Sequence, residues 1–174
     1  MKKASKCIRL YDVIFPIWLI WLIPPVIFIA LAANFVADTI VILVIFAVIK
    51  NKGAGCYSIS SLYKKSILKV WLLGFAADII SAILLTIFSM ITGLLPNNII
   101  GAVMLNPFTN IWGLLIVLFF VALAGMLIFL FNYHITFKKI IHEKALKCKI
   151  SIAIAIITAP WTFLIPTAWI YKGY

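Results

Sequence analysis

Uninterrupted apolar stretches of about twenty residues limit what this chain can fold into more than any other feature of its sequence. An α-helix rises about 1.5 Å per residue, so twenty residues match the roughly 30 Å hydrocarbon layer of a bilayer. Of the 174 residues, 66% are hydrophobic and only 11% are charged. A soluble domain has about a quarter of its residues charged. The sequence therefore predicts an all-α, polytopic integral membrane protein.

The hydropathy pattern predicts a single membrane domain over residues 1–174 with about five spans. Pro24 and Pro25 should kink the first span, which we interpret as a retained anchor rather than a cleaved signal. A very tight turn follows, and Asn34 is expected to cap the second span, so that these two helices form a hairpin. The predicted spans cover about 11–32, 35–49, 67–91, 111–133 and 150–171.

Two segments between the spans are expected to be helical without crossing the membrane. Residues 98–105 are too few to span and form either an interfacial helix, which we favour, or a re-entrant loop. Residues 134–149 alternate lysines with apolar side chains at helical spacing, which predicts an amphipathic helix along the inner membrane surface, where Glu143 pairs with Lys147. Pro160 and Pro166 should bend or displace the second half of the last span.

The basic residues occupy alternate connecting segments. Fourteen of the fifteen lysines and arginines precede the first predicted span or lie between the second and third or the fourth and fifth, and the exception is Lys172. Cytoplasmic loops carry such an excess of positive charge. The pattern predicts the cytoplasmic membrane of a bacterium, with the N-terminus inside and the C-terminus outside. It explains the net charge of +11 without a nucleic acid partner. We expect anionic lipid headgroups to contact the lysines of the fourth connection, Lys138, Lys139, Lys144 and Lys147.

The sequence lacks the motifs of the common catalytic and metal sites. His134 and His142 lie eight residues apart, with no HExxH motif or cysteine cluster beside them, so no metal site is predicted. Cys7, Cys56 and Cys148 all fall in segments predicted to be cytoplasmic, where thiols stay reduced. No P-loop, nucleophile elbow or Gly-rich dinucleotide turn is present. We therefore expect neither an enzyme nor a cofactor.

Asp78 and Asp38 are the two acidic residues in the interior of the predicted spans, since Asp12 lies at the very start of the first. Asp78 follows Lys69 by nine residues, which places it roughly 13 Å deep and close to the midplane. No Lys, Arg or His lies at that depth. Two alternatives follow, a protonated carboxyl that hydrogen-bonds between helices and a proton or cation site. Asp38 is expected one turn past Asn34, near a helix start and the outer surface, where the helix dipole stabilises a carboxylate.

Small and polar residues at helical spacing accompany Asp78 and let helices pack closely. Ser81 lies on the same predicted helix face as Asp78, and the last span carries a matching polar stripe. The candidates for an intramembrane polar site are Asp78, Asp38, Asn34, Ser81, Thr158 and Thr162.

Residues 132–139, with the sequence NYHITFKK, resemble the end of the last span in small GtrA-like membrane proteins, a family linked to polyprenyl-sugar handling. That family has four spans, whereas the hydropathy of this chain predicts five, and we transfer no functional residue from it.

Two main functional hypotheses fit these features. The first is a small transport or permeation protein for a proton- or cation-coupled solute, with Asp78 as the site, and it implies a homo-oligomer because one chain has little room for alternating access. The second is a non-catalytic membrane subunit of a larger secretion, conjugation or export assembly, which implies other membrane subunits as partners. An enzyme acting on lipid is a third and weaker hypothesis, because only one candidate site exists.

Overall fold

The computed structural model describes residues 16–20, 23, 24, 26–51, 59–91 and 95–169 of the chain. These residues form helices and their connections, without a strand. Four of the helical segments are long and apolar enough to cross a membrane: Val26–Val48, Ser60–Ile91, Ile111–Thr136 and Lys144–Leu164. The prediction of an all-α chain with several candidate membrane spans is confirmed at this level.

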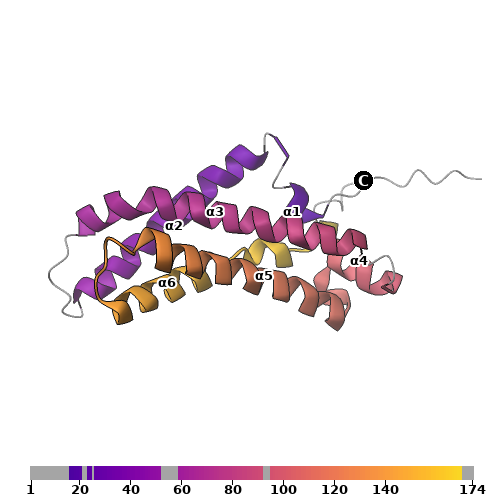
Figure 1. Ribbon diagram of the computed structural model, residues 1–174. Helices are drawn as coiled ribbons and strands as arrows, with labels where there is room; N and C mark the ends of the chain where they lie inside the picture. Colours follow the sequence, from indigo (N-terminus) through magenta and orange to yellow (C-terminus); the bar gives the residue numbers. More distant parts are fainter. Residues whose placement is uncertain (1–15, 21–22, 25, 52–58, 92–94, 170–174) are drawn as a thin grey trace, which may run out of the picture.

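The four long helices pack into an elongated bundle (Figure 1). α3 (Ile59–Ile91) contacts both α2 (Val26–Asn51) and α5 (Ile111–Phe131), while α6 (Lys144–Thr158) contacts both α5 and α2. The contacts therefore close into a ring of four helices. The short α1 (Ile17–Ile20) packs on α3 and on the 3-10 helix η3 (Trp161–Leu164) near the C-terminal end of the described chain.

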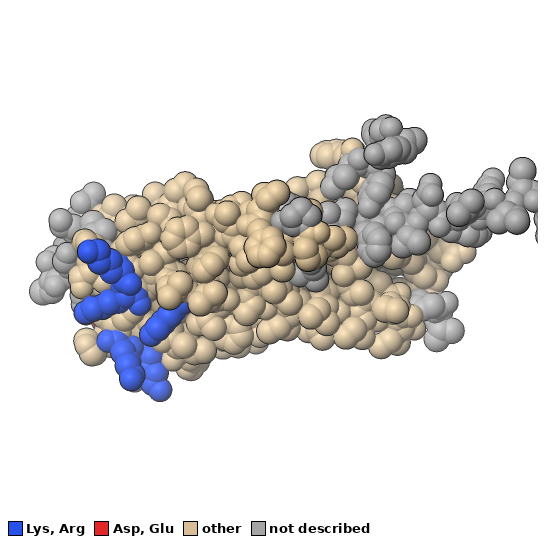
Figure 2. All heavy atoms as spheres, turned by 90° about the horizontal axis from the view of Figure 1, so that it is seen from above, with Lys and Arg blue, Asp and Glu red and all other residues tan. Residues whose placement is uncertain are grey.

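One end of the bundle carries most of the described lysines, and we call it the lysine end (Figure 2). It comprises the start of α3, with Lys64 and Lys65, and the connection from α5 to α6, with Lys138, Lys139 and Lys144; all five lysines are exposed. The opposite end holds α4 (Asn97–Leu105) and the 3-10 helices η1 (Pro107–Thr109) and η4 (Thr167–Trp169). Charge is thus segregated along the long axis of the molecule.

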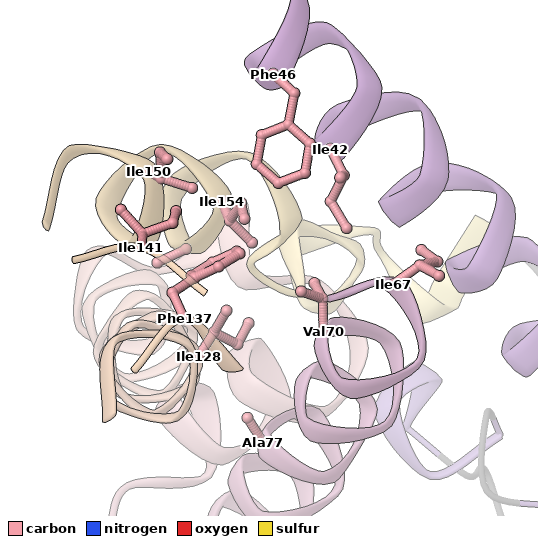
Figure 3. Close-up of a cluster of buried hydrophobic side chains, with 11 residues drawn as sticks. Ile42, Phe46, Ile67, Val70, Ala77, Ile128, Phe137, Ile141, Ile150 and Ile154 are labelled. Atoms are coloured by element: carbon pink, nitrogen blue, oxygen red, sulfur yellow. The ribbon is translucent and has the colours of Figure 1, made fainter. Parts of the chain in front are cut away.

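Two apolar clusters fill the bundle. The first lies toward the lysine end, where Phe46 of α2 and Phe137 after α5 meet edge to face with ring centroids 6.4 Å apart (Figure 3). The second lies toward the opposite end and joins α1 to α3, α5 and η3 through Trp18, Leu85, Phe120 and Phe163. Large apolar side chains on the outside of the helices remain exposed, as expected of helices that face lipid.

α2 is one continuous helix across the region where the sequence predicts a tight turn. It runs from Val26 to Asn51 with Asn34 in its interior, so the predicted turn after residue 32 and the hairpin built on it are wrong. The segment contains no Pro or Gly, and a helix interior tolerates a single Asn at small cost. The break comes earlier, because α2 begins directly after Pro24 and Pro25. Residues 11–15, 21, 22 and 25 of the first predicted span lie outside the described residues.

The amphipathic helix predicted over 134–149 does not form. α5 continues as a π-helical turn, η2 (Asn132–Thr136), the chain reverses over residues 137–143, and α6 begins at Lys144. Of the apolar residues of this segment, Phe137 and Ile141 are buried in the first cluster and Ile140 and Leu146 pack against it, whereas Ile135 is exposed. When this segment closes the end of the bundle, the apolar area of the packed side chains is buried inside the protein. A surface helix would leave that area at the membrane interface. The predicted Glu143–Lys147 ion pair is not seen either, because the Lys147 Nζ lies 4.2 Å from the centroid of the Tyr133 ring.

Two other sequence predictions agree with the structure. Residues 97–105 form the helix α4, whose Ala102 and Val103 are buried against α5. The last span is interrupted as its prolines require: α6 ends at Thr158, and the chain goes on through η3 and η4, which follow Pro160 and Pro166.

Candidate functional site

Asp38 and Asp78 both lie well inside long helices, Asp38 near the middle of α2 and Asp78 in the middle third of α3. The prediction that Asp38 sits near a helix start, stabilised by the helix dipole, is therefore wrong. That prediction depended on a turn after residue 32, where the structure has the continuous helix α2. Asn34 is likewise no helix cap but an interior residue, one turn before Asp38 on α2.

The two carboxyl groups line one cavity of about 360 Å³ between α2, α3 and the end of α6. Gly74, one turn before Asp78, lies beside the Asp38 side chain, since a Cβ at Gly74 would be 3.9 Å from Asp38 Oδ2, an ordinary van der Waals distance. Asn34 and Thr158 complete the polar lining. The structure thus brings together four of the six predicted site residues.

Neither carboxyl group has a protein partner among the residues that the structure describes. Asp38 is only 6% exposed and makes no hydrogen bond or ion pair there, and the Oδ1 atom of Asp78 is buried without a hydrogen-bond donor. No Lys, Arg or His belongs to the described lining of the cavity. An ionised carboxylate in such surroundings needs compensation, so a proton or a bound cation must balance the charge.

A second cavity of about 180 Å³ adjoins the first, since Asp78, Asn34 and Thr158 line both. Its other polar residue is Thr162, a predicted site residue on η3. Most of its wall is apolar, with the aromatic side chains of Trp18, Phe75 and Phe163. The site therefore has an acidic part and an aromatic part that meet at Asp78.

The interruption of α6 adds backbone dipoles to the acidic cavity. Ile157, Thr158 and Ala159 line it, at the point where the α-helix ends. Pro160 has no N–H to continue the helical pattern, and the Trp161 amide donates to Ala159 O at 2.7 Å. The last carbonyls of a helix carry its negative dipole end, which attracts positive charge.

Ser81, the sixth predicted site residue, lies away from both cavities. It is fully buried, and its hydroxyl donates a 2.6 Å hydrogen bond to the Phe120 carbonyl of α5. Its role is therefore the interhelical contact that the sequence analysis considered for Asp78. Thr158 also bonds locally, since its hydroxyl donates to Ile154 O at 2.9 Å.

The aromatic wall of the second cavity has no distinguishing signal in the sequence. Trp18 lies before the proline break, Phe75 directly follows Gly74 on α3, and Phe163 lies after the interruption of α6. Aromatic residues are common throughout the chain, and no pattern in the sequence separates these three from those that only pack. Their convergence follows from the packing of α1 on both α3 and η3.

The lysines predicted to contact lipid headgroups lie together at the lysine end, with Lys138, Lys139 and Lys144 exposed and Lys147 over the Tyr133 ring. His134 packs edge to face on the same Tyr133 ring, with centroids 4.9 Å apart. Over the described parts of the chain, no three His, Cys, Asp or Glu side chains gather into a group suited to a metal ion.

The described residues define an all-helical fold with four candidate membrane spans and an acidic cavity lined by Asp38 and Asp78 between α2, α3 and the end of α6. Comparison with protein-family models, with curated proteins and with solved structures finds no match to the chain.

Proposed function

We propose that this protein is a small multi-pass membrane transporter or permeation protein for a proton- or cation-coupled solute, with Asp38 and Asp78 as its ion-carrying pair. The observation that carries the proposal is the shared cavity of the two carboxyl groups, which make no hydrogen bond or ion pair with any described residue. Intramembrane carboxyl groups of this kind are typical of proton relays and ion pathways.

The interrupted helix α6 supports the same proposal. Many transporters bind their ions and substrates where a helix is broken in mid-membrane and its end points into a cavity. Here the broken end at Thr158 borders the cavity that holds both carboxyl groups.

The proposal includes a location and an orientation. We place the bundle in the cytoplasmic membrane of a bacterium with the lysine end inside, because positively charged connections resist translocation. The opposite end, with α4 and η4, then faces outward. Anionic lipid headgroups surround the exposed lysines of the inner end. We further propose a homo-oligomer as the transporting unit, because four spans leave little room for alternating access within one chain.

Proton flux into proteoliposomes tests the proposal. A pH gradient is imposed on vesicles that contain the wild type, the Asp78→Asn variant or the Glu143→Gln variant, and internal pH is followed with a trapped dye. Glu143→Gln is the matched control, because it makes the same change from carboxyl to amide at an exposed residue of the lysine end.

We expect the wild type and Glu143→Gln to carry protons and Asp78→Asn to carry none while keeping its thermal stability and elution volume. Equal flux in all three proteins would refute the ion-carrying role of Asp78. Absence of wild-type flux, together with stoichiometric co-purification of other membrane proteins, would favour the alternative of a non-catalytic subunit of a larger assembly.

A further inference from the structure

We propose that the solute bound between α2, α3 and the end of α6 is an organic cation with an apolar, preferably aromatic, body: its charged nitrogen lies between Asp38 and Asp78, and its body enters the cavity lined by Trp18, Phe75 and Phe163. This inference rests on the site of the proposed function and names the chemistry of its ligand.

The charge of the ligand follows from the lining of the larger cavity. Two carboxyl groups and the carbonyl end of α6 face it, and its described lining contains no positive side chain. Asp38 is more than nine-tenths buried without a hydrogen bond among the described residues, so its ionised form needs a cation inside the cavity. When the two carboxyl groups are ionised they repel an anion, and a neutral solute leaves their charge without compensation.

The apolar body follows from size and from the second cavity. A volume of about 360 Å³ is far more than a bare metal ion needs, since one water molecule takes roughly 30 Å³ of liquid. The adjoining 180 Å³ is walled by Trp18, Phe75 and Phe163 together with alanines. Aromatic faces attract organic cations through the ring quadrupole, and they bury apolar groups favourably. A metal ion would gain nothing from this wall.

Calorimetric titration of the purified protein in detergent tests the inference independently of transport. The probe is benzyltrimethylammonium chloride, which combines a permanent positive charge with one aromatic ring. Tetramethylammonium chloride carries the same charge without the ring, and sodium chloride supplies a metal ion. The proteins are the wild type, Asp78→Asn, Asp38→Asn, Phe75→Leu and the control Glu143→Gln.

We expect saturable binding of benzyltrimethylammonium to the wild type and to Glu143→Gln. Either aspartate variant should weaken it by about tenfold or more, and tetramethylammonium should bind at least about tenfold more weakly than the benzyl compound. Phe75→Leu keeps an apolar side chain at this position but removes a ring, so it should weaken binding of the benzyl compound. If one aspartate variant misfolds, the inference is still tested by the other variant and by the relative affinities of the wild type for the three salts.

Three results would overturn the inference: no saturable binding to the wild type, equal affinity for the benzyl and tetramethyl compounds, or binding that neither aspartate variant changes. Because binding is measured without a gradient, its outcome is separable from that of the proposed function. Binding without flux in proteoliposomes would leave the ligand class standing and refute transport. Proton flux without binding of the benzyl compound would support transport and refute the proposed ligand class.

Discussion

Asp38 of α2 and Asp78 of α3, forty residues apart in the sequence, line the same cavity, and Gly74 of α3 lies beside the Asp38 side chain. A Cβ at Gly74 would lie 3.9 Å from Asp38 Oδ2, an ordinary van der Waals distance. The smallest residue of the helix thus stands beside the most buried carboxyl group of the site. The two acids form one site because α2 and α3 pack closely at this point.

The size of the side chain at position 74 should determine proton flux through the cavity without unfolding the protein. Gly74→Ala adds one methyl group at contact distance, so we expect stability and proton flux close to the wild type. Gly74→Leu places a branched side chain into the cavity beside Asp38 and should strongly reduce flux. Flux assays on both variants, with thermal denaturation in detergent as the control for folding, check the prediction. A fully active leucine variant would mean that the cavity is not on the ion path.

The contact of α4 with α5 depends on Gly113. A Cβ added there would meet the Ala102 Cβ at 2.5 Å and the Val103 backbone nitrogen at 3.3 Å, so Gly113→Ala must displace α4. We expect a loss of about 1–3 kcal/mol of stability, the usual cost of overpacking. Gly101→Ala on α4 is the matched control, because a Cβ there meets nothing within 4 Å. Denaturation curves for both variants test this, and equal stability would contradict the close packing.

Much of the fold follows from the sequence because hydrophobic length and proline position act locally. Long apolar runs make helices in a bilayer, and the prolines at 24, 25, 160 and 166 mark the interruptions. The turn predicted after residue 32 fails because an Asn is a weak signal on its own: the same residue caps one helix and lies within another. Only the packing of α2 along α3, tied by the 2.9 Å bond from Trp71 Nε1 to Leu31 O, settles which applies.

The site was also predictable only in part, because tertiary packing and not local sequence decides which side chains meet. Burial depth in a span identified Asp78, and the polar stripe of the last span identified Thr158 and Thr162. The depth of Asp38 depended on the wrong turn, and Ser81 shares a helix face with Asp78 yet bonds to Phe120 O instead. The segment 134–149 shows that helical periodicity alone does not determine where a segment lies. Amphipathic spacing fits a surface helix and a bundle-closing turn equally well, and tertiary contacts decide between them.

The two ends of the bundle should lie on opposite sides of the membrane, with the lysine end inside. Cys148, which is partly exposed on α6, serves as the inner marker, and Asn98→Cys on α4 is the outer one, with Cys7 and Cys56 replaced by Ser. An impermeant maleimide applied to intact cells should label the cysteine at position 98 at once and Cys148 only after lysis. The opposite pattern would invert the proposed orientation.

Anionic lipid should be held by charge at the lysine end. Each basic residue near an anionic membrane surface contributes about 1 kcal/mol of attraction. Replacing Lys138, Lys139, Lys144 and Lys147 with Gln should therefore reduce the phosphatidylglycerol that stays bound in native mass spectrometry. Replacing His134 and His142 with Gln should leave it unchanged. Loss of lipid in the histidine variant but not in the lysine variant would contradict the lipid role. Stoichiometric zinc in the wild type that the histidine variant loses would do so too, and it would revive the hypothesis of an enzyme.

The central claim is that the carboxyl groups of Asp38 and Asp78 exchange a proton for a cation, and infrared difference spectroscopy tests it most directly. Spectra of the reconstituted protein are recorded before and after addition of benzyltrimethylammonium chloride or sodium chloride, and at rising pH. We predict that protonated carboxyl absorption is lost and carboxylate absorption gained in the wild type and in Glu143→Gln. The Asp38→Asn, Asp78→Asn double variant should show neither change. A wild-type carboxyl band that neither pH nor either cation alters would contradict the account and leave the two acids as structural hydrogen-bonding groups.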